Sequence, residues 1–194
     1  MRTRSGPTQC LVLFLLACAA TVSGACGDDG TPAAPPVCTG TGCTCADSAC
    51  TCAAGTDCHT ACGASACALD CTTSAKCNGE STGALTLTCA DTSECKGNGG
   101  PDSHITCAAM SHCELKAGDG STATCSDSAD CKLNLGASST VSCEDTSSCN
   151  VKCDAGCTVT CAATADCSLT CGASDGGTGG MTCPDGRLVC GTSC

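Results

Sequence analysis

The sequence has almost no aromatic side chains and few large aliphatic ones. It contains no Trp and no Tyr, and its one Phe, Phe14, lies in an apolar stretch near the N-terminus. After position 25, Leu, Ile, Val and Met together occur only sixteen times. Burying each of these side chains contributes roughly 1.5–3 kcal/mol, whereas ordering one residue costs roughly 1.5 kcal/mol. Such a core cannot hold the rest of the chain, so covalent cross-links or metal ions must contribute.

Positively charged residues are also scarce. After position 25 the chain has 6 Lys and Arg against 19 Asp and Glu, which gives a net charge of −13. Binding to nucleic acid requires a basic surface that contacts phosphates, and binding to anionic lipid headgroups has the same requirement. The sequence therefore predicts no nucleic-acid partner, and it predicts membrane contact only through an attached lipid.

The 29 cysteines lack the spacing of a zinc or thioredoxin-type redox centre. No two of them are separated by two residues, which is the spacing that structural zinc sites and such redox centres favour. Two Cys-x-Cys pairs, Cys43/Cys45 and Cys50/Cys52, resemble those of metallothioneins. A metal-binding thiol protein is therefore an alternative, but we predict no bound metal and no cofactor.

The N-terminus has the features of a secretory signal peptide. Arg2 and Arg4 precede an apolar run over Leu11–Ala20, which is too short to span a membrane. We predict that residues 1–25 are the signal peptide, residues 26–37 a flexible tether, and residues 38–194 one folded domain. Export would place the cysteines in an oxidising compartment, where thiols pair.

The segment Ser23-Gly24-Ala25-Cys26 resembles a bacterial lipobox, in which the cysteine is acylated and becomes the new N-terminus. It departs from the usual pattern at Ser23, where an aliphatic residue is common, and cleavage after Ala25 without lipidation is the alternative. Lipidation of Cys26 leaves 26 cysteines from Cys38 onward, an even number that can all pair. The prediction is an outer-membrane or cell-surface lipoprotein, and otherwise a secreted or periplasmic protein.

An 18-residue repeat that begins at a cysteine dominates the remaining sequence. Five units of this length span residues 71–88, 89–106, 107–124, 125–142 and 143–160. A unit lengthened by one residue (52–70) and a unit lengthened by four (161–182) flank them. Shorter units at 45–51 and 183–194 are typical of the caps of a repeat array.

Within a unit, Cys and apolar residues concentrate at odd positions, namely one, seven, nine and seventeen, and in some units eleven. A helix would spread these positions around its axis, and Gly, Thr and Ser are poor helix formers. Alternation is the signature of strands, and the segments rich in Gly, Ala, Asp and Ser between them indicate corners. The sequence therefore predicts an all-β, single-domain parallel β-solenoid with 18-residue coils and many disulfides.

Positions one and seven place two cysteines inside one coil, on either side of a five-residue corner. We predict that they pair within each coil, where each bridge contributes roughly 2 kcal/mol through chain entropy. Pairing between stacked coils is the alternative, because neighbouring strands lie about 4.8 Å apart. The main candidates are Cys71, Cys77, Cys89, Cys95, Cys107, Cys113, Cys125, Cys131, Cys143, Cys149, Cys161 and Cys167.

The same spacing argument extends to the ends of the array. It predicts the coil pairs Cys52–Cys58 and Cys183–Cys190, the second-corner pairs Cys62–Cys67 and Cys153–Cys157, and the cap pairs Cys38–Cys43 and Cys45–Cys50. Cys171 and Cys194 each lie four residues after the second cysteine of a coil, so we predict that they meet at neighbouring levels.

Positions sixteen and eighteen point outward and carry hydroxyl side chains in several coils. Exposed strands favour Thr in general, so an ordinary strand surface is the simpler interpretation. A flat hydroxyl array that binds ice or another ordered surface is the alternative, although His104 and Gly180 interrupt it. The candidate face comprises Thr86, Thr88, Thr122, Thr124, Thr140, Ser142, Thr158 and Thr160.

A Thr-Cys dipeptide followed by Cys-x5-Cys on successive β-coils resembles the disulfide-rich insect antifreeze solenoids. The resemblance covers residues 51–183 in pattern only, because that family has shorter coils and places Thr on both sides of Cys. Overall the sequence is more similar to cysteine-rich repeat lipoproteins of Gram-negative bacteria. That resemblance implies export and a solenoid fold but no known activity.

No constellation of catalytic residues is evident. His59, His104 and His112 occupy different repeat positions and have no paired nucleophile or acid. Position three is often Asp, which is a standard turn residue, and Ala109 and Ala163 break any carboxylate ladder that could bind calcium. We predict a non-catalytic protein, either structural or surface-binding, whose ligand the sequence leaves open. The aspartates at position three are Asp47, Asp91, Asp127 and Asp145.

Overall fold

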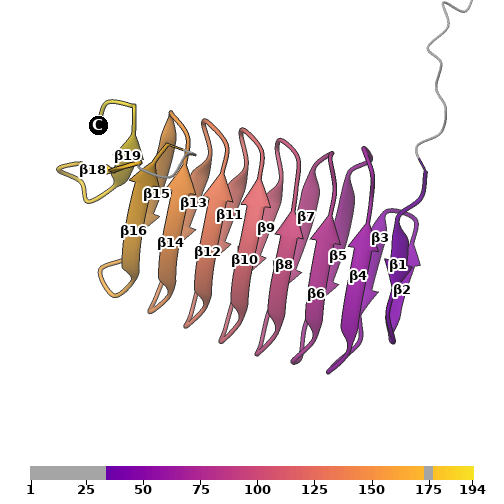
Figure 1. Cartoon of the computed structure of the whole chain (residues 1–194). Helices are drawn as coiled ribbons and strands as arrows, with labels where there is room; N and C mark the ends of the chain where they lie inside the picture. Colours follow the sequence, from indigo (N-terminus) through magenta and orange to yellow (C-terminus); the bar gives the residue numbers. More distant parts are fainter. Residues whose placement is uncertain (1–33, 173–176) are drawn as a thin grey trace, which may run out of the picture. The chain divides into compact units, whose positions relative to one another are not determined.

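The computed structural model describes residues 34–172 and 177–194. Every regular element in these residues is a β-strand. The strands form two sheets, and each coil contributes one strand to each sheet before the chain advances to the next coil (Figure 1). The prediction of an all-β parallel solenoid with 18-residue coils is confirmed. No helix that is long and apolar enough to cross a membrane occurs in the described ranges.

The first sheet, sheet A, has nine strands. In spatial order these are β1 (Val37–Thr39), β4 (Asp57–Ala61), β6 (Lys76–Glu80), β8 (Glu94–Asn98), β10 (His112–Ala117), β12 (Asp130–Leu135), β14 (Ser148–Cys153), β16 (Asp166–Cys171) and β17 (Thr178–Gly179). From β4 to β16 the neighbours are parallel, and equivalent repeat positions face each other in the central coils, as Cys113 faces Cys131.

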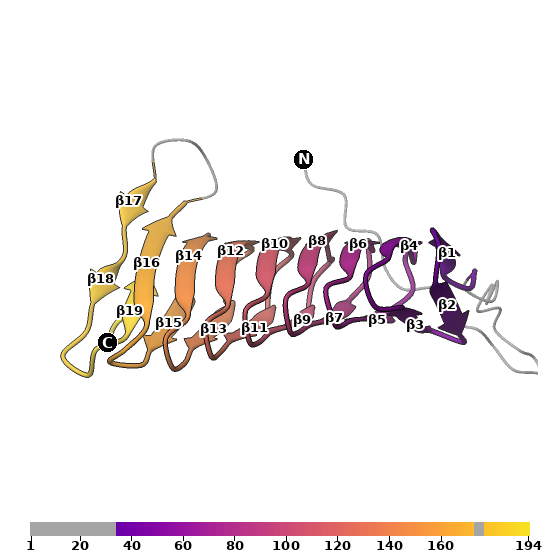
Figure 2. The same ribbon diagram turned by 90° about the horizontal axis from the view of Figure 1, so that it is seen from below.

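The second sheet, sheet B, has ten strands and lies along the opposite side of the coils (Figure 2). In spatial order these are β2 (Cys43–Ala46), β3 (Ala49–Cys52), β5 (Cys67–Cys71), β7 (Leu85–Cys89), β9 (His104–Cys107), β11 (Thr122–Cys125), β13 (Thr140–Cys143), β15 (Cys157–Cys161), β19 (Leu188–Cys190) and β18 (Met181–Thr182). Its strands from β3 to β15 are also parallel.

The core lies between the two sheets and follows the odd positions that the sequence predicts. Along β10 and β12, for example, buried residues alternate with outward ones. Leucines of sheet B fill the space that glycines of sheet A leave: a Cβ on Gly79 would lie 3.2 Å from Leu69 Cδ2 and 3.4 Å from Leu85 Cδ2. In the next coils the sizes reverse, because Leu115 comes from sheet A and the small Ala123 from sheet B. Small and large side chains thus complement each other across the core.

The corner after sheet B turns through a residue with positive φ, as at Asp91 (φ 60°) and Asp127 (φ 58°). The carboxylate at this corner accepts a hydrogen bond from the backbone of the preceding coil. Thr73 N donates to Asp91 Oδ2 at 3.1 Å, and Ala109 N donates to Asp127 Oδ2 at 3.2 Å. Asp is therefore placed here by turn geometry, as the sequence interpretation holds.

Antiparallel strands close both ends, which the sequence analysis did not predict. At the N-terminal end, β1 pairs antiparallel with β4, and β2 pairs antiparallel with β3. At the C-terminal end, β17 pairs antiparallel with β16, and β19 with β15. Such reversed strands cover the last parallel strands and leave only short edges, which limits edge-to-edge association.

Candidate binding faces

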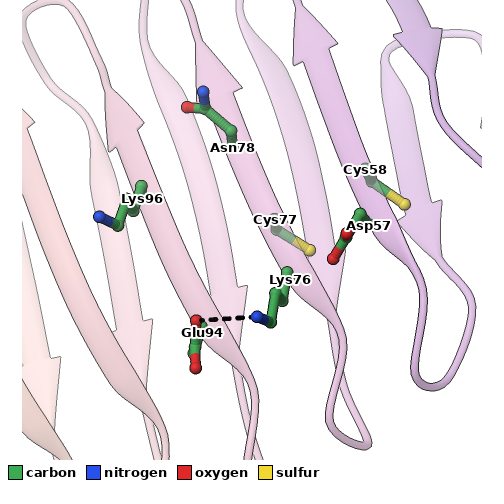
Figure 3. Close-up of a pocket in the computed structure, with 7 residues that line it drawn as sticks. All are labelled: Asp57, Cys58, Lys76, Cys77, Asn78, Glu94 and Lys96. Atoms are coloured by element: carbon green, nitrogen blue, oxygen red, sulfur yellow. Dashed lines mark ion pairs between the residues drawn. The ribbon is translucent and has the colours of Figure 1, made fainter.

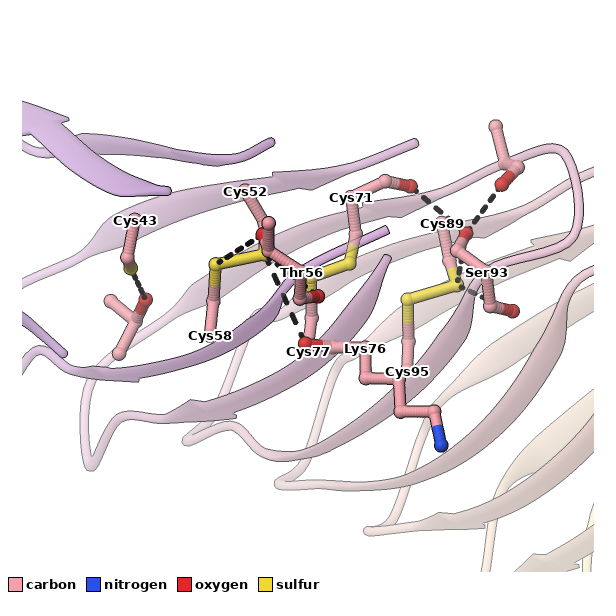
Figure 4. Close-up of a disulfide and its surroundings, with 12 residues drawn as sticks. Cys43, Cys52, Thr56, Cys58, Cys71, Lys76, Cys77, Cys89, Ser93 and Cys95 are labelled. Atoms are coloured by element: carbon pink, nitrogen blue, oxygen red, sulfur yellow. Dashed lines mark hydrogen bonds between the residues drawn. A yellow bond between two sulfur atoms is a disulfide. The ribbon is translucent and has the colours of Figure 1, made fainter. Parts of the chain in front are cut away.

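The disulfides form a ladder through the core and hold each coil closed (Figure 4). In seven coils the cysteines at positions one and seven are bonded, with Cα–Cα distances of 5.9–6.6 Å. These bonds are Cys52–Cys58, Cys71–Cys77, Cys89–Cys95, Cys107–Cys113, Cys125–Cys131, Cys143–Cys149 and Cys161–Cys167. In these seven coils the cysteines at positions one and seven therefore pair within a coil and not with the neighbouring coil.

Four shorter-range bonds also match the predicted pairs. Cys62–Cys67 and Cys153–Cys157 close the second corner of their coils, and Cys38–Cys43 and Cys45–Cys50 lie in the N-terminal cap. Every cysteine in the described residues takes part in a disulfide.

The two C-terminal pairs differ from the prediction. Cys171 is bonded to Cys190, and Cys183 to Cys194, instead of Cys183 to Cys190 and Cys171 to Cys194. The prediction assumed one more parallel coil, but the chain reverses at Gly186 (φ 87°) and β19 runs antiparallel to β15. The reversal carries Cys190 back into the core, where its Cα lies 5.4 Å from that of Cys171.

Sulfur atoms of neighbouring bridges come close enough to suggest metal sites. Those of Cys107, Cys113 and Cys131 lie within 4.8 Å of one another. The closeness follows from the stacking of successive coils, and each of these sulfurs is already in a disulfide. A zinc ligand is a thiolate, so this arrangement could hold a metal only after reduction.

The outward side of sheet B carries two columns of hydroxyl side chains, which we call the threonine face. Residues at positions sixteen and eighteen of β7, β9, β11, β13 and β15 stack in register from coil to coil. Neighbouring strands lie about 4.8 Å apart, and alternate residues on a strand lie about 6.6 Å apart. The first column is Thr86, His104, Thr122, Thr140 and Thr158, and the second is Thr88, Thr106, Thr124, Ser142 and Thr160.

The predicted face is thus assembled as one surface of exposed and half-buried side chains. Thr106 belongs to it too; the Thr-x-Thr criterion omitted this residue, although its repeat position is evident in the sequence. His104 interrupts the first column, and its Nδ1 is hydrogen-bonded to Thr122 Oγ1. Gly180, the other predicted interruption, lies between β17 and β18, outside the parallel array.

The outward side of sheet A differs in chemistry, and we call it the charged face. All five lysines of the chain lie on it, at even positions of β6, β8, β10, β12 and β14. Lys76 Nζ lies 3.7 Å from Glu94 Oε2, and Lys96 Nζ lies 3.2 Å from Glu114 Oε2. Figure 3 shows the first of these pairs together with Lys96. The hydrogen bond and the charge of Lys96 lower the pKa of Glu114.

The three histidines lie on three different strands. His59 and His112 lie on sheet A at different positions, and His104 lies on sheet B. His112 Nδ1 is 3.0 Å from Asp130 Oδ2, the residue that faces it on the next coil. This pair follows the same coil-to-coil pattern as the lysine–glutamate pairs.

Comparisons with protein-family models, with curated proteins and with solved structures find no match for this chain. The many disulfides indicate an oxidising environment, extracellular or periplasmic. The predicted signal peptide and the predicted lipidation site Cys26 lie outside the described residues.

Proposed function

We propose that the protein is a non-catalytic exported lipoprotein whose solenoid binds an ordered, repetitive surface through the threonine face. The observation that carries this proposal is the pair of in-register columns over five successive coils, in which every side chain except His104 carries a hydroxyl. A single hydroxyl contact contributes only about 1 kcal/mol. A row of them acts together only if the ligand repeats in step with the coils, as a crystalline or polymeric surface does.

Rigidity supports the same proposal. Each strand of the face is joined to its coil by a disulfide, and β-branched Thr has few rotamers in a strand. The hydroxyls therefore lose little entropy on binding, which raises the affinity for a surface that fits them. A sheet face also contacts a ligand from one side only, which suits an extended surface better than a small molecule.

Adsorption to ordered solids tests the proposal. The purified solenoid is mixed with ice, microcrystalline cellulose and crystalline chitin, and the bound fraction is measured. Replacing Thr122, Thr124, Thr158 and Thr160 by Lys inserts long charged side chains into two columns. We expect the bound fraction on the preferred solid to fall at least tenfold, with circular dichroism unchanged.

A matched control places the same number of lysines on the charged face. Asn78, Asn98, Ser148 and Ser168 are outward residues of sheet A, and their replacement by Lys should leave adsorption unchanged. Equal losses in both variants, or no adsorption of the unchanged protein to any of the solids, would refute a role for the threonine face.

Ice is a second, more specific candidate for the bound surface. It is favoured by the Thr-x-Thr pairs of three coils, by the Thr140-x-Ser142 pair of a fourth, and by the resemblance to insect antifreeze solenoids. Thermal hysteresis of the unchanged protein tests it directly, and the absence of hysteresis would end this candidate.

The lipid anchor is tested by mass spectrometry of protein from its native host. We expect the mature chain to begin at Cys26 and to carry a diacylglycerol group. An unmodified Cys26 would remove the anchor while leaving secretion in place.

The metal-binding alternative requires free thiols, whereas a disulfide scaffold has none to spare. Thiol titration of the unfolded, unreduced protein should give close to zero free thiols if the solenoid is a disulfide scaffold. A large free-thiol count would favour the metal-binding alternative instead.

A further inference from the structure

The lysine–glutamate pairing of the charged face does not continue over β10, β12 and β14. On β6, β8 and β10, each of Lys76 and Lys96 faces a glutamate at the same position of the next coil and forms an ion pair with it. Lys116 instead faces Asn134, and Asn134 in turn faces Lys152.

Three lysines therefore form a cluster, which consists of Lys116, Lys132 and Lys152. All three are exposed, and none takes part in an ion pair with any residue in the described ranges. From the strand spacing and the rise per residue, their Cα atoms form a triangle with sides of about 8–10 Å.

The lysine cluster surrounds an open depression on the sheet. The three lysines line it together with Asn134, Asn150, Glu114 and the segment at Leu133. Glu114 faces Lys132 in the strand register, but its carboxylate pairs with Lys96 on the previous coil, at 3.2 Å. The one acidic residue that lines the depression is thus engaged on the previous coil.

Such a cluster does not serve the stability of the fold. Three ammonium groups within about 10 Å repel one another, and a glutamate at Asn134 would pair with a lysine on either side. The chain has 19 acidic residues and only five lysines, yet three of these lysines lie together without an ion pair. An anionic ligand would supply the missing counter-charges.

We propose that the lysine cluster binds an acidic polysaccharide, with each ammonium contacting one anionic group and the Asn134 and Asn150 amides contacting sugar hydroxyls. Neutral amides donate and accept hydrogen bonds, as hydroxyl-rich ligands require. Lysine acts as a point charge and needs no planar bidentate partner, which suits anionic groups separated along a polymer.

The rest of the face argues against nucleic acid as the ligand. The described residues contain no Phe, Tyr or Trp on which bases could stack. Glu114 borders the cluster, and the net charge of −13 after position 25 repels a polymer as dense in charge as a nucleic-acid duplex. A single polysaccharide chain with one anionic group on each sugar carries fewer charges per unit length than a duplex, so it is repelled less and can still contact all three lysines.

Calorimetric titration with polygalacturonate oligosaccharides at low and physiological salt tests the site. The double variant Lys132→Gln/Lys152→Gln should weaken binding about tenfold, and addition of Lys116→Gln should abolish it. The variant Lys76→Gln is the control, because it removes a charge from the same face but from a lysine that pairs with Glu94 and does not line the depression (Figure 3). We expect it to change affinity less than twofold.

The oligosaccharide affinity should fall with added salt, and neutral dextran should not bind. The proposal is overturned if polygalacturonate does not bind, if Lys76→Gln weakens binding as much as Lys132→Gln/Lys152→Gln does, or if dextran or a single-stranded oligothymidylate binds as tightly. The uncharged variant Thr122→Val/Thr124→Val/Thr158→Val/Thr160→Val should retain polygalacturonate binding in full, so this site and the threonine face can fail independently.

Discussion

Removing one central disulfide should lower the free energy of unfolding more than removing one at the end of the solenoid, and the difference can be calculated. Cys125 and Cys131 are bonded in the middle of the array and both side chains are 0% exposed. The double variant Cys125→Ala/Cys131→Ala opens a loop with a sequence separation of 6. Chain entropy gives a loss of about 2 kcal/mol for a loop of this size.

The lost packing of the sulfur atoms lowers the free energy of unfolding further. Each substitution deletes a sulfur atom from the core, and loss of a buried group of about this size costs roughly 1 kcal/mol. The two changes together should therefore lower the free energy of unfolding by about 4 kcal/mol. For a protein of this length, that corresponds to a fall in Tm of about 10 °C.

The matched control is Cys38→Ala/Cys43→Ala in the N-terminal cap. This bond has a sequence separation of 5, so its entropy contribution is close to that of the central bond. Both cysteines are only half-buried, so we expect a total loss of about 2 kcal/mol. Guanidinium unfolding followed by circular dichroism measures both variants. An equal or larger loss for the cap variant would refute the contribution of sulfur packing.

Two further changes test the core and the charged face. Gly97→Ala should lower the free energy of unfolding by about 1–2 kcal/mol in a denaturation experiment, because its Cβ would lie 2.9 Å from the Gly79 carbonyl oxygen; no loss would mean that the neighbouring strands β6 and β8 can shift to admit a methyl group. Lys96→Met should raise the pKa of Glu114 toward its ordinary value in an NMR titration, because Lys96 is the main cause of its lowering and Lys132 a smaller one. The control Lys132→Met should raise it less, and an equal rise would contradict the assignment of the hydrogen bond to Lys96.

The central coils could be predicted from the sequence because two independent signals agree there. The 18-residue repeat fixes which residues stack, and the odd-position pattern fixes which side faces inward, so the pairing of Cys107 with Cys113 follows from both. Neither signal specifies the caps. A repeat predicts only its own continuation, whereas the reversal at Gly186 depends on a local turn that covers an otherwise open edge.

The candidate surfaces were predictable to different degrees. The threonine face repeats at one pair of positions, so its columns are evident along the sequence, as Thr122 and Thr140 illustrate. The lysine cluster has no such period: Lys152 faces Asn134 and not Lys132, so the two lysines lie on neighbouring coils but out of column. Only the register of β10, β12 and β14 shows that Lys132 and Lys152 surround one depression together with Lys116.

The locality of the bridges also simplifies oxidative folding. Eleven of the thirteen bonds have a sequence separation of 6 or less, and each of these joins neighbours in the order of cysteines along the chain. A chain that emerges N-terminus first can therefore oxidise one coil at a time, since the correct partner of each new cysteine is the one just before it. Only Cys171 and Cys183 must wait for the last residues, so closure of the C-terminal end marks the completion of folding.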